Sequence, residues 1–216
     1  MARCFAASGM SVVLADIERA PLEEVAAELS DGGTAAIAVP TDVSNPEQIQ
    51  ALADAAVDEF GAVHVLCNNA GVGVSDPVGE TSLEDWRWTL DIDLWGPIHG
   101  VRTFLPIMER QGEGHINSTA SMAGLYASPS LGAYNVAKHG VVALTESLHH
   151  AMQTAGLGVG VSCLCPGWVK TGIIESDRNW PGHLGELPER DAAAEISRNY
   201  VKRAIDEGMQ PGAVAD

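Results

Sequence analysis

Positive charge is scarce in this sequence. Lysine and arginine together number 12, against 29 aspartate and glutamate residues, and the formal net charge is −17. Nucleic acids and anionic membrane surfaces would repel such a chain, so neither is an expected partner. No uninterrupted apolar run approaches the ~20 residues that a membrane-spanning helix needs. The start of the chain also lacks the pattern of a signal peptide.

Cysteine is also rare. The four cysteines are too few for a disulfide scaffold in a chain of 216 residues, and three of them lie in apolar, strand-like runs. Cys163 and Cys165 alternate along one such run and so share a face, but no histidine or further cysteine follows nearby in the sequence. We therefore predict buried free thiols in a reducing cytoplasm, and no metal site.

Apolar periodicity predicts an alternation of strands and helices. The predicted strands are apolar on both faces, which is typical of a parallel sheet covered on both sides. We expect one domain over residues 1–216, of the α/β class, with a Rossmann-like doubly wound parallel sheet. The predicted strands lie at 10–16, 34–43, 62–71, 114–121 and 157–167, and the predicted helices at 2–7, 18–29, 46–60, 83–110 and 131–155.

The regular pattern stops after the last predicted strand. Residues from Trp168 to about Arg190 are rich in glycine, proline, tryptophan and charge. A stretch of this kind beyond the carboxyl end of a strand predicts a substrate lid. Trp168 and Trp180 flank it and are candidates for an apolar substrate pocket.

In open α/β sheets the ligand lies outside the carboxyl ends of the strands. Asp16 ends the first predicted strand. A carboxylate at the equivalent place in a Rossmann fold accepts hydrogen bonds from an adenosine ribose, and its charge repels a 2′-phosphate. Asp16 taken alone is a weak signal, because strands often end in aspartate for reasons of turn formation.

The segment "AYNVAKHG" carries the strongest chemical signal. Tyr134 and Lys138 are four residues apart on a predicted helix and so share one face. A phenol with a pKa near 10 is a poor proton-transfer group at neutral pH unless a nearby ammonium stabilises the phenolate. Ser121, 13 residues before Tyr134, can hold a hydroxyl or carbonyl oxygen. The three side chains suit removal of a hydroxyl proton while hydride leaves to a cofactor.

These motifs together resemble the classical short-chain dehydrogenase/reductase family. The matching residues occur in the family's order and cover essentially the whole chain. They are Asp16, Thr41-Asp42-Val43, Asn68-Asn69-Ala70-Gly71, Ser121, Tyr134-x3-Lys138 and Pro166-Gly167-Trp168-Val169-Lys170-Thr171.

The resemblance implies a nicotinamide cofactor, a small-molecule alcohol or carbonyl substrate, and a role for each matching residue. Tyr134 would act as acid and base, Lys138 would lower its pKa and bind the nicotinamide ribose, and Ser121 would position the reacting oxygen. Asp16 then indicates NAD rather than NADP. The other implied contacts are Asp42 and Val43 at the adenine, Asn69, Ala70 and Gly71 at a ribose, and Pro166, Gly167, Val169 and Thr171 at the nicotinamide.

The resemblance also implies an oligomer. The helices around Asp93 and Tyr134 form dimer and tetramer contacts in relatives. A homodimer or homotetramer is therefore the expected assembly.

Two departures from the family concern the ends of the chain. The family's glycine-rich turn, Thr-Gly-x3-Gly-x-Gly, precedes the ribose-binding acid by about 20 residues, and counting back that far from Asp16 passes Met1. The expectation is therefore a chain truncated before its first strand, leaving unpaired edges on the strands that end at Asp16 and Asn68. The end, "GMQPGAVAD", matches only the start of the family's last helix.

A third departure lies inside the predicted site. The segment "WRWTLDIDLWG" has Asp93 where the family has the asparagine that is its fourth catalytic member. A carboxylate there still accepts hydrogen bonds, but it cancels part of the field of Lys138 at Tyr134. We predict a higher Tyr134 pKa than in an Asp93→Asn variant, unless backbone geometry alone supports the family's water chain.

Three functions remain open from the sequence. The first is an NAD-dependent oxidoreductase of a secondary alcohol or carbonyl. The second is a non-catalytic remnant or oligomerisation partner that binds no dinucleotide. The third is an epimerase or dehydratase on the same fold, which shares the Tyr/Lys chemistry.

Overall fold

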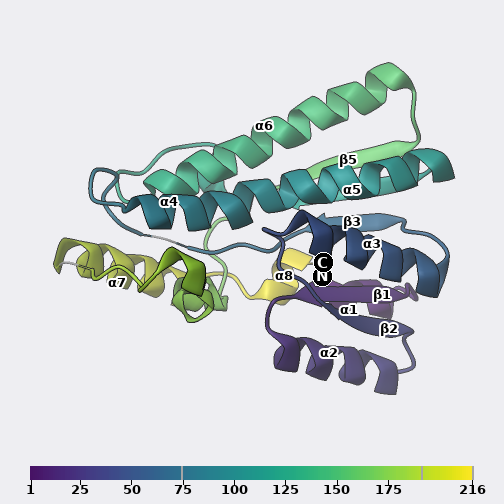
Figure 1. Ribbon diagram of the computed structural model, residues 1–216, viewed down its shortest axis with the longest axis horizontal. Helices are drawn as coiled ribbons and strands as arrows, with labels where there is room; N and C mark the ends of the chain where they lie inside the picture. Colours follow the sequence, from purple (N-terminus) through teal and green to yellow (C-terminus); the bar gives the residue numbers. More distant parts are fainter. Residues whose placement is uncertain (74, 191, 216) are drawn as a thin grey trace.

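The described part of the chain contains five parallel strands in two separate sheets. A computed structural model describes residues 1–73, 75–190 and 192–215. In one sheet β1 (Val12–Asp16) pairs with β2 (Ala36–Pro40). In the other, β3 (Val65–Asn68), β4 (Gly114–Thr119) and β5 (Val159–Leu164) lie in the order β3-β4-β5. The α/β class and the parallel pairing predicted from the sequence are confirmed (Figure 1).

Helices connect the strands and cover them. α2 packs on β1 and β2, whereas α5 and α6 pack on β4, which lies in the middle of the three-stranded sheet. None of the described helices is both long enough and apolar enough to cross a membrane. The helices are α1 (Ala2–Ala7), α2 (Arg19–Asp31), α3 (Pro46–Phe60), α4 (Leu83–Leu90), η1 (Asp91–Trp95), α5 (Gly96–Gln111), η2 (Met122–Gly124), α6 (Gly132–Ala155), η3 (Gly172–Asn179), η4 (Gly182–Leu184), α7 (Ala192–Asp206) and α8 (Pro211–Ala215).

Local sequence explains the ends of α3. The Asn45 side chain accepts hydrogen bonds from the backbone N–H groups of Glu47 and Gln48, at 2.9 and 3.3 Å, and Pro46 occupies the first helical position. Both groups suit a helix start, because the first N–H groups have no partner inside the helix. At the other end Gly61 adopts φ 77°, a left-handed conformation that glycine tolerates without strain.

Two hydrophobic clusters hold the layers together. Met108 on α5 and Ile116 on β4 are fully buried and pack with Leu148 and Met152 of α6. A second cluster places Phe104 of α5 against apolar residues of α3, with side chains from both sheets at its edge. α5 therefore contributes to both clusters and links the two halves of the molecule.

The structure corrects two details of the sequence prediction. The predicted long helix over 83–110 is interrupted by the π-helical turn η1, so α4 and α5 are separate α-helices. The strands are also covered less completely than predicted: every residue of β2 and of β3 is only half-buried. In the described part of the chain β1 pairs only with β2, and β3 only with β4. One edge of each of these strands therefore lacks a pairing strand.

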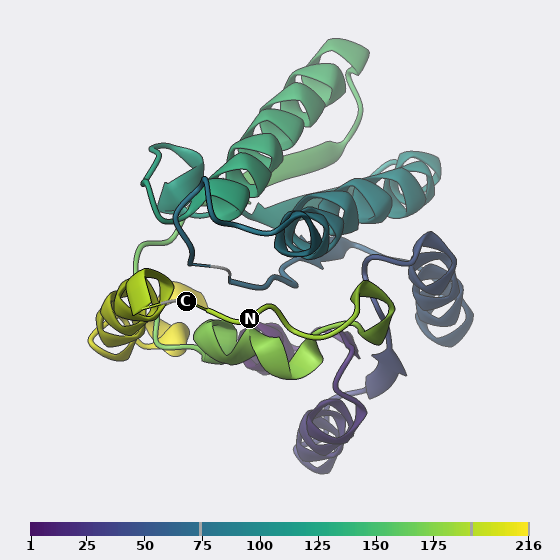
Figure 2. The same cartoon turned by 60° about the vertical axis from the view of Figure 1, so that its left-hand side comes forward.

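The segment after β5 crosses the molecule from α4 toward β1. Trp180 packs edge to face on Trp88 of α4, with ring centroids 5.1 Å apart, and Arg178 pairs with Glu18 just after β1. Figure 2 shows η3, in light green, between the teal helices α4 and α5 and the dark α2. The segment predicted as a lid therefore lies over the region where the two sheets end.

Candidate active site

A cavity of about 630 Å³ opens at the carboxyl ends of the strands. The ends of β1, β3, β4 and β5 contribute to its wall, together with the first turns of α6 and the segment after β5. Eleven of the residues predicted to form the site line it, and Asp42, Val43 and Asp93 do not. The eleven are Asp16, Asn69, Ala70, Gly71, Ser121, Tyr134, Lys138, Pro166, Gly167, Val169 and Thr171.

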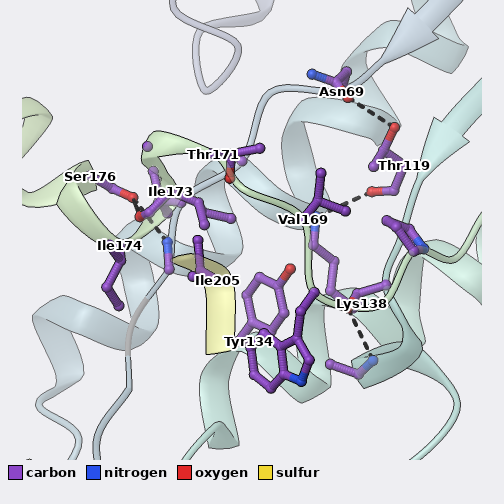
Figure 3. A pocket seen from close by; sticks show the side chains of 18 of the residues that line it. Asn69, Thr119, Tyr134, Lys138, Val169, Thr171, Ile173, Ile174, Ser176 and Ile205 are labelled. Carbon is purple, nitrogen blue, oxygen red and sulfur yellow. Dashed lines mark hydrogen bonds between the residues drawn. The ribbon is translucent and has the colours of Figure 1, made fainter. Parts of the chain in front are cut away.

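Tyr134 and Lys138 lie one turn apart on α6, as their spacing predicts. The Lys138 Nζ is 5.4 Å from the centroid of the Tyr134 ring. Figure 3 shows the Tyr134 hydroxyl pointing into the cavity, near Val169. Ser121 follows β4 and caps η2, where its hydroxyl accepts a hydrogen bond of 3.1 Å from the Ala123 N–H. A strand end and a helix start thus bring the three groups into one cavity.

Asp93 does not line the cavity, but it forms an ion pair with the ammonium group of Lys138. The Lys138 Nζ is 3.3 Å from Asp93 Oδ2 and donates a hydrogen bond of 3.2 Å to the carbonyl of Thr119. The other carboxylate oxygen of Asp93 accepts the Val72 N–H at 2.7 Å. Both partners are almost fully buried, with side-chain exposures of 4% for Lys138 and 0% for Asp93. The ammonium is therefore held by a direct ion pair that water does not screen.

The pKa values of these groups follow from burial and from their charges. Burial raises the pKa of Tyr134, the positive charge of Lys138 opposes that rise, and the negative charge of Asp93 adds to it. Burial by itself would lower the pKa of Lys138, but Asp93 and the Tyr134 oxygen outweigh it, and the pKa ends above its ordinary value. Burial raises the pKa of Asp93 against the opposing effect of Lys138 and the Val72 N–H. The net pKa of Tyr134 is raised, chiefly by burial, and the predicted difference from an Asp93→Asn variant stays a prediction.

Asp42 and Val43 lie outside the cavity. The Asp42 carboxylate folds back onto its own loop and accepts hydrogen bonds from the N–H and the hydroxyl of Ser44, at 2.9 and 2.7 Å. Val43 packs so closely on Gly96 that a side chain at Gly96 would meet it at 2.9 Å. The predicted contacts of these two residues with an adenine stay predictions.

The two tryptophans that flank the predicted lid differ in their surroundings. Trp168 lines the cavity. Trp180 instead packs on Trp88, and its indole N–H donates a hydrogen bond of 3.0 Å to the Gly185 carbonyl. Trp180 is therefore a packing residue of the segment after β5 and does not line the cavity, because it packs on α4 instead.

Other residues of the site are not indicated by any sequence motif. Arg178 and Asn179 line the cavity close to Asp16, and both donate hydrogen bonds of 2.8 Å to Glu18 Oε1. Apolar side chains from η2, η3 and α7 also line it. No sequence signal marks them, because they approach the catalytic groups only through the path of the segment after β5. These apolar residues include Met122, Ile173, Ile174, Val201 and Ile205.

The cysteines form no metal site within the described chain. No group of three or more potential metal-ligating side chains occurs there. Cys163 Sγ and Cys165 Sγ lie 3.8 Å apart on one face of the strand, as their alternation predicts, and none of the cysteines forms a disulfide. The thiols are only partly buried, although buried thiols were predicted; Cys67 on β3 and Cys163 on β5 lie on strands that are themselves only half-covered.

Two of the lining residues could hold the riboses of a dinucleotide cofactor. Asp16 carries a carboxylate that can accept hydrogen bonds from ribose hydroxyls, and Lys138 carries an ammonium that can donate them. Gly71 lies between the strand end and this ammonium: a Cβ there would stand 3.5 Å from Lys138 Nζ and 3.4 Å from Asp93 Oδ1. The bare backbone leaves room for a ligand to approach the lysine. The glycine-rich turn that cradles a pyrophosphate in Rossmann folds does not occur in the 216 residues.

Comparisons with known proteins agree with this geometry. The family model described as short chain dehydrogenase matches residues 1–182. The chain is 38% identical over 174 residues to 1-deoxy-11-beta-hydroxypentalenate dehydrogenase of Streptomyces exfoliatus, covering 79% of this chain and 62% of that protein. It is 34% identical to cyclohexanol dehydrogenase of an Acinetobacter species, over 88% of this chain and 77% of that protein.

A solved structure is similar over almost all of the chain. It is a short chain dehydrogenase/reductase from Burkholderia phymatum in complex with NAD, with a TM-score of 0.94 and 45% sequence identity. The similarity covers 96% of this chain and 74% of that one. The fold is therefore similar to that of this short chain dehydrogenase/reductase over almost all of the chain.

Proposed function

This chain belongs to the short-chain dehydrogenase family, and from that premise we propose that it is an oxidoreductase acting on a secondary alcohol or the matching ketone. The observation that carries the proposal is the meeting of Ser121, Tyr134 and Lys138 in the cavity that Asp16 also lines. The match spans 62% of the length of the Streptomyces relative. Because the match leaves part of that relative uncovered, the activity is proposed from the residues of the cavity and is not transferred from the relative.

In the proposed reaction the chain's own residues move one proton. Tyr134, as phenolate, takes the hydroxyl proton of the alcohol while Ser121 donates a hydrogen bond to the same oxygen. A bound nicotinamide dinucleotide supplies the hydride acceptor at the carbinol carbon. Lys138 stabilises the phenolate through its positive charge, and Asp93 holds Lys138 in place. The alcohol loses a hydride and a proton, and the product is the ketone.

Asp16 supports NAD as the cofactor. Its carboxylate lines the cavity at the end of β1, where it can accept hydrogen bonds from the two hydroxyls of a ribose. A 2′-phosphate at that place would face a negative charge. The fixed positive charge nearby is Arg178, and Glu18 neutralises it.

We also propose that the chain assembles through α4, α5 and α6, as the family resemblance implies. Trp95 and Val136 expose half of their surface on η1 and α6, although both are large and apolar. Light scattering of the purified chain tests the assembly. A monomer at micromolar concentration would contradict it.

The experiment that tests the proposed function begins with cofactor binding. NADH is titrated into the purified chain, and fluorescence and thermal stability are followed together. Saturable binding with a rise in melting temperature supports the enzyme. A folded chain that binds no NADH supports instead a non-catalytic protein built on the same fold.

Turnover then tests the role of Tyr134. We expect Tyr134→Phe to lower kcat about 100- to 10,000-fold, the usual contribution of a positioned acid or base. Tyr200→Phe is the matched control, because Tyr200 lies 70% exposed on α7 outside the cavity. Equal loss in both variants would contradict the assignment.

A further inference from the structure

The cationic side chains of the cavity have an unexpected property: each is already paired. The cationic side chains among the described lining residues are Lys138 and Arg178. Lys138 faces Asp93 at 3.3 Å. Arg178 directs Nε and Nη2 to Glu18 at 2.8 and 2.6 Å, and its Nη1 donates to the carbonyls of Glu175 and Gly172 at 2.8 and 3.3 Å. Neither cation is available to hold a second anion.

The catalytic centre is accordingly neutral overall. The positive charge of Lys138 is balanced by a carboxylate at the same depth, and both side chains are nearly inaccessible to water. A substrate carboxylate beside the reacting carbon would give up its hydration without gaining a counter-charge. Burial of an uncompensated charge costs several kcal/mol in a protein interior. The chain's net charge of −17 adds a long-range repulsion of the same sign.

The wall around the catalytic groups is largely apolar, and the hydroxyls of Ser75 and Ser176 in it are already engaged. Ile174 and Ile205 line the cavity and are buried, at 5% and 4% exposure. Figure 3 shows them with Ile173 on the side of Tyr134 opposite to Lys138. The Ser75 hydroxyl bonds that of Ser197 at 2.9 Å, and Ser176 accepts the Gly73 N–H at 3.1 Å while donating to the Ile173 carbonyl. A ligand thus meets hydrocarbon at this wall.

We propose that the substrate is a secondary alcohol or ketone with uncharged, apolar carbon on both sides of the reacting centre, and that β-hydroxy and β-keto acids are excluded. This inference rests on the proposed function. It concerns the first two carbons around the carbinol, so that a carboxylate far from the reacting carbon, outside the cavity, is not affected.

A set of three matched ketones tests the proposal. Pentan-2-one, methyl acetoacetate and acetoacetate share the methyl ketone, and the last two differ in charge at nearly equal size, with the carboxyl carbon two bonds from the carbonyl carbon. Reduction with NADH is followed for each ketone. We expect kcat/KM for the carboxylate to be at least about tenfold below that of its methyl ester, which corresponds to about 1.4 kcal/mol. Equal values, or a preference for the acid, would overturn the proposal.

A second test of the proposal adds a positive charge to the cavity wall. Met122 lines the cavity and is 47% exposed, so Met122→Lys can introduce an ammonium without disturbing a packed core. We expect this variant to raise the acid-to-ester ratio of kcat/KM about tenfold. Leu125→Lys adds the same charge three residues away, at a side chain 62% exposed outside the cavity, and should leave the ratio unchanged. Equal shifts in both variants would contradict the local argument.

Binding separates this proposal from the proposed function. If none of the ketones is reduced, the oxidoreductase assignment fails. The rise in melting temperature that each ketone gives the NADH-saturated chain then still shows which of the ketones the cavity binds. Stabilisation by the ester and not by the acid supports the uncharged substrate class. Stabilisation by neither, or by the acid alone, overturns it.

Discussion

Gly124 lies directly on the backbone of Lys138. A Cβ on Gly124 would meet the Lys138 carbonyl oxygen at 2.6 Å and its carbonyl carbon at 2.9 Å. The turn that carries Ser121 is therefore packed against α6, and the absence of a side chain at Gly124 allows the contact. This backbone contact sets the separation between Ser121 and the pair Tyr134 and Lys138.

Gly124→Ala should consequently push η2 away from α6. Because the obstacle is backbone and cannot rotate aside, we expect a loss of about 1–3 kcal/mol in the free energy of unfolding, the usual cost of overpacking. The catalytic rate should fall as well. Gly79→Ala is the control, since no atom lies within 4 Å of the added methyl. Thermal unfolding and kcat measure both effects, and a Gly124→Ala protein as stable and active as the control would contradict the contact.

Asp93 should control the pH dependence of the reaction. Its charge helps to raise the pKa of Tyr134, and oxidation of the alcohol requires the phenolate, so the rate should rise with pH through that pKa. Asp93→Asn removes the opposing charge, and the rising limb should move to lower pH.

The control for this experiment is Asp91→Asn. It removes the same formal charge from the same π-helical turn, at a residue that does not touch Lys138. The pH profile of kcat for alcohol oxidation is compared among the three proteins. Coincident profiles for Asp93→Asn and the parent would show that Asp93 acts through geometry alone.

Asp16 should determine the choice between NAD and NADP. Asp16→Ser keeps a hydrogen-bonding group but removes the charge that opposes a 2′-phosphate. We expect the ratio of kcat/KM for NAD over NADP to fall at least about tenfold, or 1.4 kcal/mol. Asp31→Ser, at the far end of α2, is the control. An unchanged ratio would mean that Asp16 does not meet the ribose.

The pair formed by Glu18 and Arg178 should slow release of the cofactor. It ties η3 to the end of β1 across the cavity, and Arg178 holds the pKa of the Glu18 carboxyl below its usual range through its hydrogen bond. The pair is partly exposed, with side-chain exposures of 28% and 50%, so its effect should be modest.

Glu18→Gln tests the effect of this ion pair on cofactor release. We expect the dissociation rate of NADH to rise about two- to fivefold, which corresponds to the energy of an exposed ion pair. Glu23→Gln breaks a comparable pair with Arg19, 3.2 Å long and confined to α2, and should leave the rate unchanged. Stopped-flow fluorescence measures the NADH dissociation rate of both variants. Identical rates would show that the pair of Glu18 and Arg178 does not slow release of the cofactor.

Cys165 should resist alkylation in the folded protein. Burial and the neighbouring Cys163 raise its pKa to about 11, so at pH 8 only about one thiol in a thousand is the reactive thiolate. Mass spectrometry after iodoacetamide treatment should show labelling of Cys165 at least about tenfold slower than that of glutathione. Denaturation in urea should abolish the difference. Rapid labelling of the native chain would contradict the predicted pKa.

The local features of this protein could be predicted from its sequence because they depend on near neighbours in the chain. Periodicity predicts the strands and helices, Asn45 and Gly61 mark the ends of α3, and the spacing of Tyr134 and Lys138 places both on one face of α6. Each of these features is decided within one or two turns of backbone, where hydrogen-bonding patterns and side-chain direction are fixed.

The contacts that complete the site were decided by the tertiary structure alone. Arg178 lies 160 residues from its partner Glu18, and 45 residues separate Lys138 from Asp93. Residue type marked Asp93 as unusual, but only the π-helical turn η1 and the packing of α6 place its carboxylate 3.3 Å from the lysine. Such distances depend on the path of the whole chain and on which buried charges can find a partner, and no local pattern contains that information.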